Sequence, residues 1–186
     1  DEETSPDGKE WKSAALITSA LGDLRDPKIT VRPDNRLMLT SAVALSGDSP
    51  YKHRSLAWFS ADGADWGEPV SIGHPNLWLW RVTWHQGRAY GIGYGCGKDR
   101  SVRLYSSQDG KKFETLVERL FAEGYPNETS LVFDGDTAYC LLRRDDQPNS
   151  GLLGVSLPPY TQWEWKDLGT RIGGPRLGFL LVLALV

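Results

Sequence analysis

The sequence has little of the chemistry that marks metalloproteins and nucleic-acid-binding proteins. Among its 186 residues are only two cysteines, Cys96 and Cys140, which lie too far apart for a CxxC metal motif. The three histidines, His53, His74 and His85, share no metal-ligand spacing either. The formal net charge of -3 offers no basic surface to a polyanion. We therefore expect no metal, no cofactor and no nucleic-acid partner.

Long apolar runs are also lacking. The most apolar stretch, residues 177–186, is far shorter than the roughly 20 residues that a membrane-spanning helix needs, so it is predicted to be a buried strand. Residues 1–8 contain no basic start and no apolar core of a signal peptide. The protein is therefore either cytoplasmic or has had its signal peptide removed, and of these we expect a secreted or periplasmic protein.

Aromatic residues and glycines are, by contrast, abundant. Eight Trp, seven Tyr and twenty Gly favour β-sheets joined by tight turns. A content of 40% hydrophobic and 24% charged residues excludes intrinsic disorder. Because aromatic rings combine an apolar face with a polar edge, polar ligands that stack on rings fit this composition, and sugars are one such class.

A short motif occurs twice in the chain. Residues 60–66 read S-A-D-G-A-D-W, and residues 107–113 read S-Q-D-G-K-K-F, 47 positions later. A third, degenerate copy ends at Trp163, and residues 157–160 replace its Ser and Asp. The Ser and Asp side chains can bond to backbone N–H groups of a turn, and Gly adopts a φ that other residues resist. We interpret the aspartates of this motif as structural rather than catalytic.

Predicted hairpins alternate with the motif. Their turns, at residues 33–35, 86–87 and 134–136, are spaced by about 50 residues. A repeat of this length with four short strands is one blade of a β-propeller. The predicted fold is all-β, with an N-terminal segment at 1–19 and about 3.5 four-stranded blades in 20–186. The fourth blade is expected to begin at Gly173.

The motif resembles the Asp box, S-x-D-x-G-x-[T]-W, of the sialidase (neuraminidase) superfamily and its BNR-repeat relatives. Both copies here are one residue shorter between Asp and Gly. The resemblance implies a sialidase-type propeller with six blades, of which the C-terminal ones are absent from this sequence. It also implies an exo-α-sialidase-like glycoside hydrolase that acts on terminal acidic sugars of glycans. Such enzymes hold the sugar carboxylate with three arginines.

The same resemblance assigns roles to five residues. Glu128 would assist the family's tyrosine nucleophile, and Asp48 would be the acid/base. The sugar carboxylate would be bound by Arg25, Arg144 and Arg176. The alternatives are structural. Arg25 could be half of an ordinary surface ion pair and Asp48 a turn former, and Arg144 could belong to a solvated charge run.

Glu128 and Arg144 open one predicted strand and close the next. Because a hairpin returns the chain to the same end of the sheet, we expect the side chains of Glu128 and Arg144 to face one pocket. Arg143 would then point to the opposite face. On another predicted strand, alternation places Trp78, Trp80 and Trp84 on one face, which we interpret as core packing rather than a sugar platform.

The family's nucleophile is the missing part, because no tyrosine follows Tyr160. The chain is therefore either a piece that lacks the last blades or a relative that has lost the nucleophile. Two functions stay open: a sialidase-like hydrolase of glycans, and a non-catalytic carbohydrate-binding or interaction propeller. The open edges of a partial propeller would also allow a homo-oligomer to form.

Overall fold

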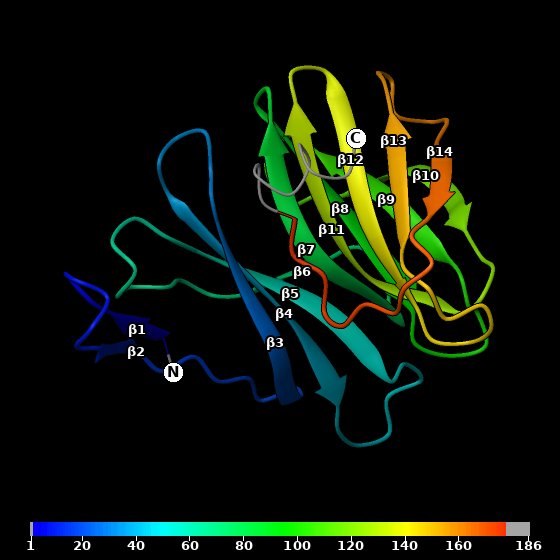
Figure 1. The fold of residues 1–186 in the computed structure, drawn as a ribbon. Helices are drawn as coiled ribbons and strands as arrows, with labels where there is room; N and C mark the ends of the chain where they lie inside the picture. The colour runs from blue at the N-terminus through cyan, green and yellow to red at the C-terminus, as the bar shows by residue number, and fades with distance from the viewer. Residues whose placement is uncertain (1, 178–186) are drawn as a thin grey trace.

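The computed structural model describes residues 2–177, which form strands and turns. Fourteen strands within this range make one two-stranded and three four-stranded sheets, all antiparallel. The three larger sheets fan out side by side (Figure 1). The all-β prediction is confirmed. Between residues 2 and 177 there is no helix long and apolar enough to cross a membrane.

Each four-stranded sheet is built from consecutive strands and is called a blade below. Blade I contains β3 (Gly22–Val31), β4 (Leu37–Leu45), β5 (His53–Ser60) and β6 (Val70–Ile72). Blade II contains β7 (Leu77–His85), β8 (Arg88–Gly95), β9 (Val102–Ser107) and β10 (Glu114–Phe121). Blade III contains β11 (Pro126–Asp134), β12 (Thr137–Arg144), β13 (Leu152–Ser156) and β14 (Glu164–Asp167). The first strands of the blades, β3, β7 and β11, contact one another in series and are therefore innermost.

The blades are held together by apolar side chains on their facing surfaces. Between blades I and II, Met38 and Ile72 pack with Leu79 and Val82, and the ring of Tyr105 joins them. A second cluster, between blades II and III, contains residues of β8, β9, β11, β12 and β13. Fully burying one Leu or Met side chain contributes about 1.5–3 kcal/mol, so these two layers supply the main cohesion.

Turns with the sequence S-x-D-G, named Asp-box turns below after the motif they resemble, join the third and fourth strands of blades I and II. In the first, Gly63 N donates to Ser60 Oγ at 2.8 Å, and the next two backbone N–H groups donate to Asp62 Oδ1 at 2.9 and 3.0 Å. In the second turn Ser107 and Asp109 make the same bonds at 2.9, 2.8 and 2.9 Å. The glycines adopt φ values of 81° and 72°. These contacts match the structural role that we predicted for the two aspartates.

The N-terminal segment contains a further copy of the motif that the sequence analysis missed. Residues 5–11 read S-P-D-G-K-E-W and join β1 (Glu2–Thr4) to β2 (Lys12–Ala15). Asp7 accepts two backbone N–H groups at 2.9 and 3.3 Å, and Gly8 has a φ of 73°. The hairpin is thus equivalent to the outer half of a blade. It was overlooked because its first strand, Glu-Glu-Thr, lacks the apolar pattern of a strand.

The predicted third copy of the motif needs a correction. Its serine is kept as Ser156, the last residue of β13. Trp163 Nε1 donates to Tyr160 O at 3.0 Å, as Trp66 Nε1 donates to Gly63 O at 2.9 Å. The serine was misassigned because this loop is one residue longer than the other turns. The predicted fourth blade, from Gly173, falls mainly on residues 178–186, outside the described residues.

The Asp-box turns predict a pH dependence of stability. Backbone N–H donors lower the pKa of Asp62 and Asp109 below the usual 3.8. Because the folded pKa is depressed, the stabilisation is complete above the unfolded pKa and is lost as pH falls through the folded one. We therefore expect the difference in Tm between the wild type and an Asp62→Asn, Asp109→Asn variant to shrink below about pH 4.

Thermal unfolding monitored by circular dichroism between about pH 2 and pH 7 checks this expectation. Asp48→Asn serves as the control, since Asp48 is exposed and accepts no hydrogen bond from a described residue. A Tm difference that stays constant down to the lowest pH would contradict the assignment.

Candidate functional site

A β-bulge interrupts the innermost strand of every blade. The register shifts between Arg25 and Lys28 in β3, between Leu79 and Arg81 in β7, and between Pro126 and Thr129 in β11. A bulge leaves a residue outside the regular pairing and re-aims the side chains beside it. Because these three strands lie next to one another (Figure 1), their bulges gather side chains from all three blades.

The side chains gathered in this way are called the bulge cluster. Its members are Asp26, Lys28, Trp80, Arg81, Tyr94 and Glu128. Lys28 lies close enough to Asp26, Arg81 and Glu128 for their charges to act on its pKa, which burial lowers and the two carboxylates raise. The Lys28 ammonium also lies 4.3 Å from the centroid of the Trp80 ring. The cluster therefore combines two carboxylates, two cations and two rings.

Glu128 is held by an ion pair with Arg143. Arg143 Nη1 donates to Glu128 Oε2 at 2.9 Å, and both side chains are less than one quarter exposed. Arg143 also donates through Nε to Asp145 at 2.9 Å. Burial opposes the charge of Arg143, but its hydrogen bonds to Glu128 and Asp145 raise its pKa. These contacts fix the Glu128 carboxylate at the start of β11.

The expectation that Arg144 faces Glu128 is wrong. Directly paired residues of antiparallel strands point to the same face, and Thr129 pairs with Leu142. The next position along places Glu128 beside Arg143, and the bulge then pairs Pro126 with Arg144. The number of residues in the hairpin correctly predicts that Glu128 and Arg144 lie at the same end of the sheet. Which face of the sheet each side chain points to depends on the register of the two strands.

Arg144 instead has a structural position. Its side chain is 4% exposed and donates to Ser150 O at 2.8 Å, Ser150 Oγ at 2.7 Å and Asp167 Oδ2 at 2.6 Å. The Ser150 hydroxyl, the Gly169 N–H and Arg144 together lower the pKa of Asp167 to about 2. Arg144 thus ties the end of β12 to β14 and to the loop before β13.

The other predicted site residues are divided between the cluster and the surface. Arg25 forms an ion pair with Asp23 at 2.8 Å, and both side chains are more than half exposed. Asp48 is exposed in the turn between β4 and β5. Arg176 is exposed as well, but it lies near Arg81, whose pKa is lowered by burial and by the charge of Arg176. The structure therefore places Glu128 in the cluster and Arg176 at its exposed edge beside Arg81, whereas Arg25 and Asp48 lie elsewhere on the surface.

Aromatic rings line one side of the bulge cluster. Tyr94 stacks on Trp78 with a centroid distance of 5.9 Å and an interplanar angle of 9°, and Trp80 lies 6.2 Å from Tyr94. Burial raises the pKa of Tyr94, so its hydroxyl stays protonated and can donate a hydrogen bond. Trp80 Nε1 and Arg81 Nε have no hydrogen-bond partner among the described atoms. Both atoms are buried beneath the surface of the cluster.

The bulge in β7 also changes which aromatic residues share a face. Trp78 and Trp80 pack together with Ala42, whereas Trp84 packs with Val82 in the layer between blades I and II. The prediction that all three tryptophans lie on one face is wrong, because the extra residue shifts the alternation. The interpretation as core packing fits Trp78 and Trp80, which are 8% and 7% exposed.

Sequence reasoning missed Asp26, Lys28, Arg81 and Tyr94 as site residues. The one signal that could have pointed to the first two is the Asp26-Pro27 dipeptide inside a predicted strand. Proline is disfavoured within a sheet except at edges and bulges. The left-handed φ of Asp26, 53°, agrees with such an irregularity.

Within residues 2–177, no group of His, Cys, Asp and Glu side chains is arranged to hold a metal ion. Cys96 and Cys140 are free thiols.

The sequence matches no protein-family model and no curated protein. Solved structures, however, share the arrangement of the blades. A protein of unknown function from Dyadobacter fermentans has a TM-score of 0.77 at 16% identity, covering 91% of this chain and 58% of that one. A GH43 protein from Bacillus licheniformis has a TM-score of 0.64 at 14% identity, covering 88% and 36%. The fold is that of a β-propeller.

An exo-β-1,3-galactanase from Clostridium thermocellum is a further neighbour of the propeller, with a TM-score of 0.62 at 14% identity, covering 78% of this chain and 35% of that one. Glycoside hydrolases of the GH43 propeller type are thus among the structural neighbours, and an N-acetylgalactosamine deacetylase from F. plautii is another, with a TM-score of 0.53 at 15% identity, covering 85% of this chain and 52% of that one. This chain spans less than two thirds of the length of each of these four structures. At such identities the likeness establishes the fold, and the sialidase type of the propeller stays a prediction.

Proposed function

We propose that this propeller binds glycans at the bulge cluster and that the whole protein is a glycoside hydrolase acting on a terminal acidic sugar. One observation carries the proposal. The bulges of β3, β7 and β11 bring Asp26, Arg81 and Glu128 from three blades to one place beside Lys28. The glycoside hydrolases among the structural neighbours support a carbohydrate as the ligand.

The cationic side of the cluster supports an acidic sugar. Arg81 and Arg176 lie near each other, and two like charges in proximity repel unless an anion offsets them. The Nε of Arg81 is buried and has no hydrogen-bond partner among the described residues. Guanidinium groups bind carboxylates through paired, charge-assisted hydrogen bonds. The sugar carboxylate would lie against Arg81 and Arg176.

The acidic side of the cluster supports hydrolysis. Glycoside hydrolysis commonly uses one group that protonates the leaving oxygen and a second that acts as a base, a nucleophile or its activator. Because Arg143 donates to Glu128, this carboxylate suits the second role. Asp26 is the second carboxylate of the cluster, and in our proposal it takes the role of the acid that was assigned to Asp48. Tyr94 would donate a hydrogen bond to the substrate.

A second candidate function is non-catalytic glycan binding. The observation that favours it is the ion pair of Glu128 with Arg143, since it occupies one of the two oxygens that catalysis would use. Binding by the rings and cations of the cluster does not need that oxygen. The two candidates therefore share the site and differ only in turnover.

Fluorogenic glycosides test both candidates with the purified protein. We expect hydrolysis of an acidic glycoside, such as an α-sialoside or a glucuronide, and none of a xyloside. Glu128→Gln is expected to lower kcat by about 100-fold or more, because it removes a base or nucleophile-activating group. Arg81→Met is expected to raise KM more than it lowers kcat.

The matched control is Glu118→Gln, since Glu118 is an exposed carboxylate of β10 with 78% of its side chain accessible. It should leave both constants unchanged. Binding of acidic glycans without turnover would favour the second candidate. Neither binding nor turnover, or equal effects of Glu128→Gln and Glu118→Gln, would contradict the site.

A further inference from the structure

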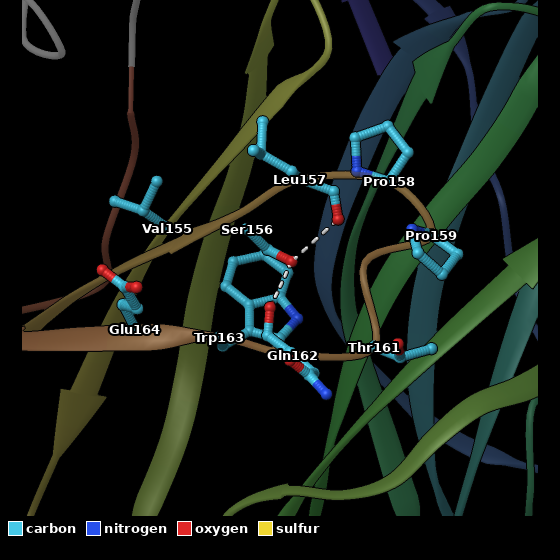
Figure 2. A pocket seen from close by; sticks show the side chains of 9 residues that line it. All are labelled: Val155, Ser156, Leu157, Pro158, Pro159, Thr161, Gln162, Trp163 and Glu164. Carbon is cyan, nitrogen blue, oxygen red and sulfur yellow. Dashed lines mark hydrogen bonds between the residues drawn. The ribbon is translucent and has the colours of Figure 1, made fainter.

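A cavity of about 640 Å³ lies at the loop between β13 and β14 (Figure 2). Its lining comes from this loop and the adjoining strand ends, Val155–Pro159 and Thr161–Glu164. The loop follows Ser156, which pairs with Ala138 near the hairpin turn of blade III. Glu128 lies near the other end of the same sheet, so this cavity is separate from the bulge cluster.

The equivalent turns elsewhere in the chain show what such a loop binds. In each of the three Asp boxes, one aspartate oxygen accepts two consecutive backbone N–H groups, at distances between 2.8 and 3.3 Å. The pair follows a glycine with a positive φ. Successive N–H groups next to a left-handed residue form a concavity that binds anions. The aspartate carboxylate is therefore the built-in anion of each turn.

The β13–β14 loop keeps the left-handed residue and the tryptophan of these turns but lacks the carboxylate, and its Tyr160 N–H donates to Leu157 O at 2.8 Å rather than to a serine hydroxyl. Tyr160, with a φ of 64°, stands in the place of the glycine, and Trp163 bonds its carbonyl as Trp66 bonds that of Gly63. Pro159 precedes Tyr160 as Asp62 precedes Gly63, so a proline stands where the aspartate would lie. The N–H groups of Thr161 and Gln162, which correspond to the pair in the other turns, donate to no described residue. Both residues are exposed and line the cavity.

We propose that the N–H groups of Thr161 and Gln162 bind the carboxylate of a small organic acid, which takes the place of the missing aspartate. The cavity has room for a sugar ring beside the carboxylate, and Pro158 and Pro159 supply an apolar wall, so a uronic acid is the expected ligand class. The one carboxylate of the lining, Glu164, lies at the opposite side of the loop from Thr161 (Figure 2). No Lys or Arg is among the described residues that line the cavity, so we expect the binding to be weak.

Titration of the ¹⁵N-labelled protein with sodium glucuronate, followed by amide chemical shifts, tests this site. We expect saturable shifts at Thr161 and Gln162. The internal controls are the paired amides of Ala64 and Asp65, which already donate to Asp62 and should not shift. Glucose should leave all four amides unchanged. If sodium acetate also shifts the Thr161 amide, the carboxylate alone is sufficient for binding. If only glucuronate shifts it, the sugar ring contributes as well. Either result supports the site.

A Pro159→Asp variant offers the loop its own carboxylate and is expected to abolish the shifts at Thr161 and Gln162. If that variant does not fold, the proposal is still tested by comparing the amide shifts of Thr161 and Gln162 with those of Ala64 and Asp65 in the wild-type protein. The absence of saturable shifts at Thr161 and Gln162, equal shifts at the Asp-box amides, or equal shifts with glucose would overturn the proposal. Because the amides are resolved individually, failure here is distinguishable from failure of glycan binding at the bulge cluster.

Discussion

Replacing Arg144 by alanine is expected to lower the free energy of unfolding by about 3 kcal/mol, since it removes a buried charge from its hydrogen-bonded partners. The side chain is 4% exposed and donates to Ser150 and Asp167. The variant leaves the Ser150 carbonyl without its donor and opens a void beside Gly124, whose hypothetical Cβ would lie 3.0 Å from Arg144 Cδ. Urea denaturation followed by tryptophan fluorescence measures the loss.

Two variants separate the causes. Arg144→Met keeps most of the apolar stem, so about half of the loss should return if packing and hydrogen bonds contribute equally. Arg25→Ala removes an exposed ion pair and should change stability by less than about 0.5 kcal/mol. An Arg144→Ala protein of unchanged stability that no longer bound glycans would contradict the structural role and support the substrate-binding role predicted from the sequence.

Gly110→Ala is expected to destabilise the protein by about 3 kcal/mol. A left-handed φ costs a residue with a Cβ about 1–2 kcal/mol, and Gly110 has a φ of 72°. The added methyl group would lie 2.9 Å from the Trp84 ring and 3.2 Å from the Met38 sulfur. Overpacking of this kind in a core costs roughly 1–3 kcal/mol more. The same denaturation experiment measures the effect.

Gly8→Ala is the matched control, because Gly8 has the same place in its Asp box and a φ of 73°, but nothing lies within 4 Å of its hypothetical Cβ. Only the backbone strain applies there, so the loss should be about 1 kcal/mol. Equal losses in the two variants would show that the packing against Trp84 is irrelevant. Local disorder of β1–β2 in Gly8→Ala would be visible in the indole shift of Trp11.

The two large effects arise from residues that the sequence presents differently. Gly110 belongs to a motif whose geometry could be predicted from its letters, because Ser, Asp and Gly act within one turn. Arg144 was assigned to the site through a count of residues along a hairpin. That count depends on the register, which a bulge near Glu128 changes by one position. Contacts within a turn are therefore predictable from sequence, whereas contacts across strands are not.

The bulge cluster shows the same limit. Glu128 was predicted as a site residue because it opens an innermost strand. Asp26, Lys28 and Arg81 were not predicted, because no local sequence pattern indicates that three strands carry bulges at a similar distance from their hairpin turns. The expected acid, Asp48, lies instead in an exposed turn. Likewise, the N-terminal Asp box escaped notice because its strand letters, Glu-Glu-Thr, show no apolar alternation, although its turn residues were complete.

The sequence by itself determined the all-β class, the repeat of about 50 residues and the closing turns, because these depend on short-range chemistry: alternating apolar residues, tight-turn glycines and side chains that bond their own backbone. Only the tertiary structure decided which charged residues meet. That choice depends on strand register and on the angle between blades, which are fixed by packing in the layers around Met38 and Leu142. The motif identified the propeller, and the bulges of its innermost strands placed the candidate site.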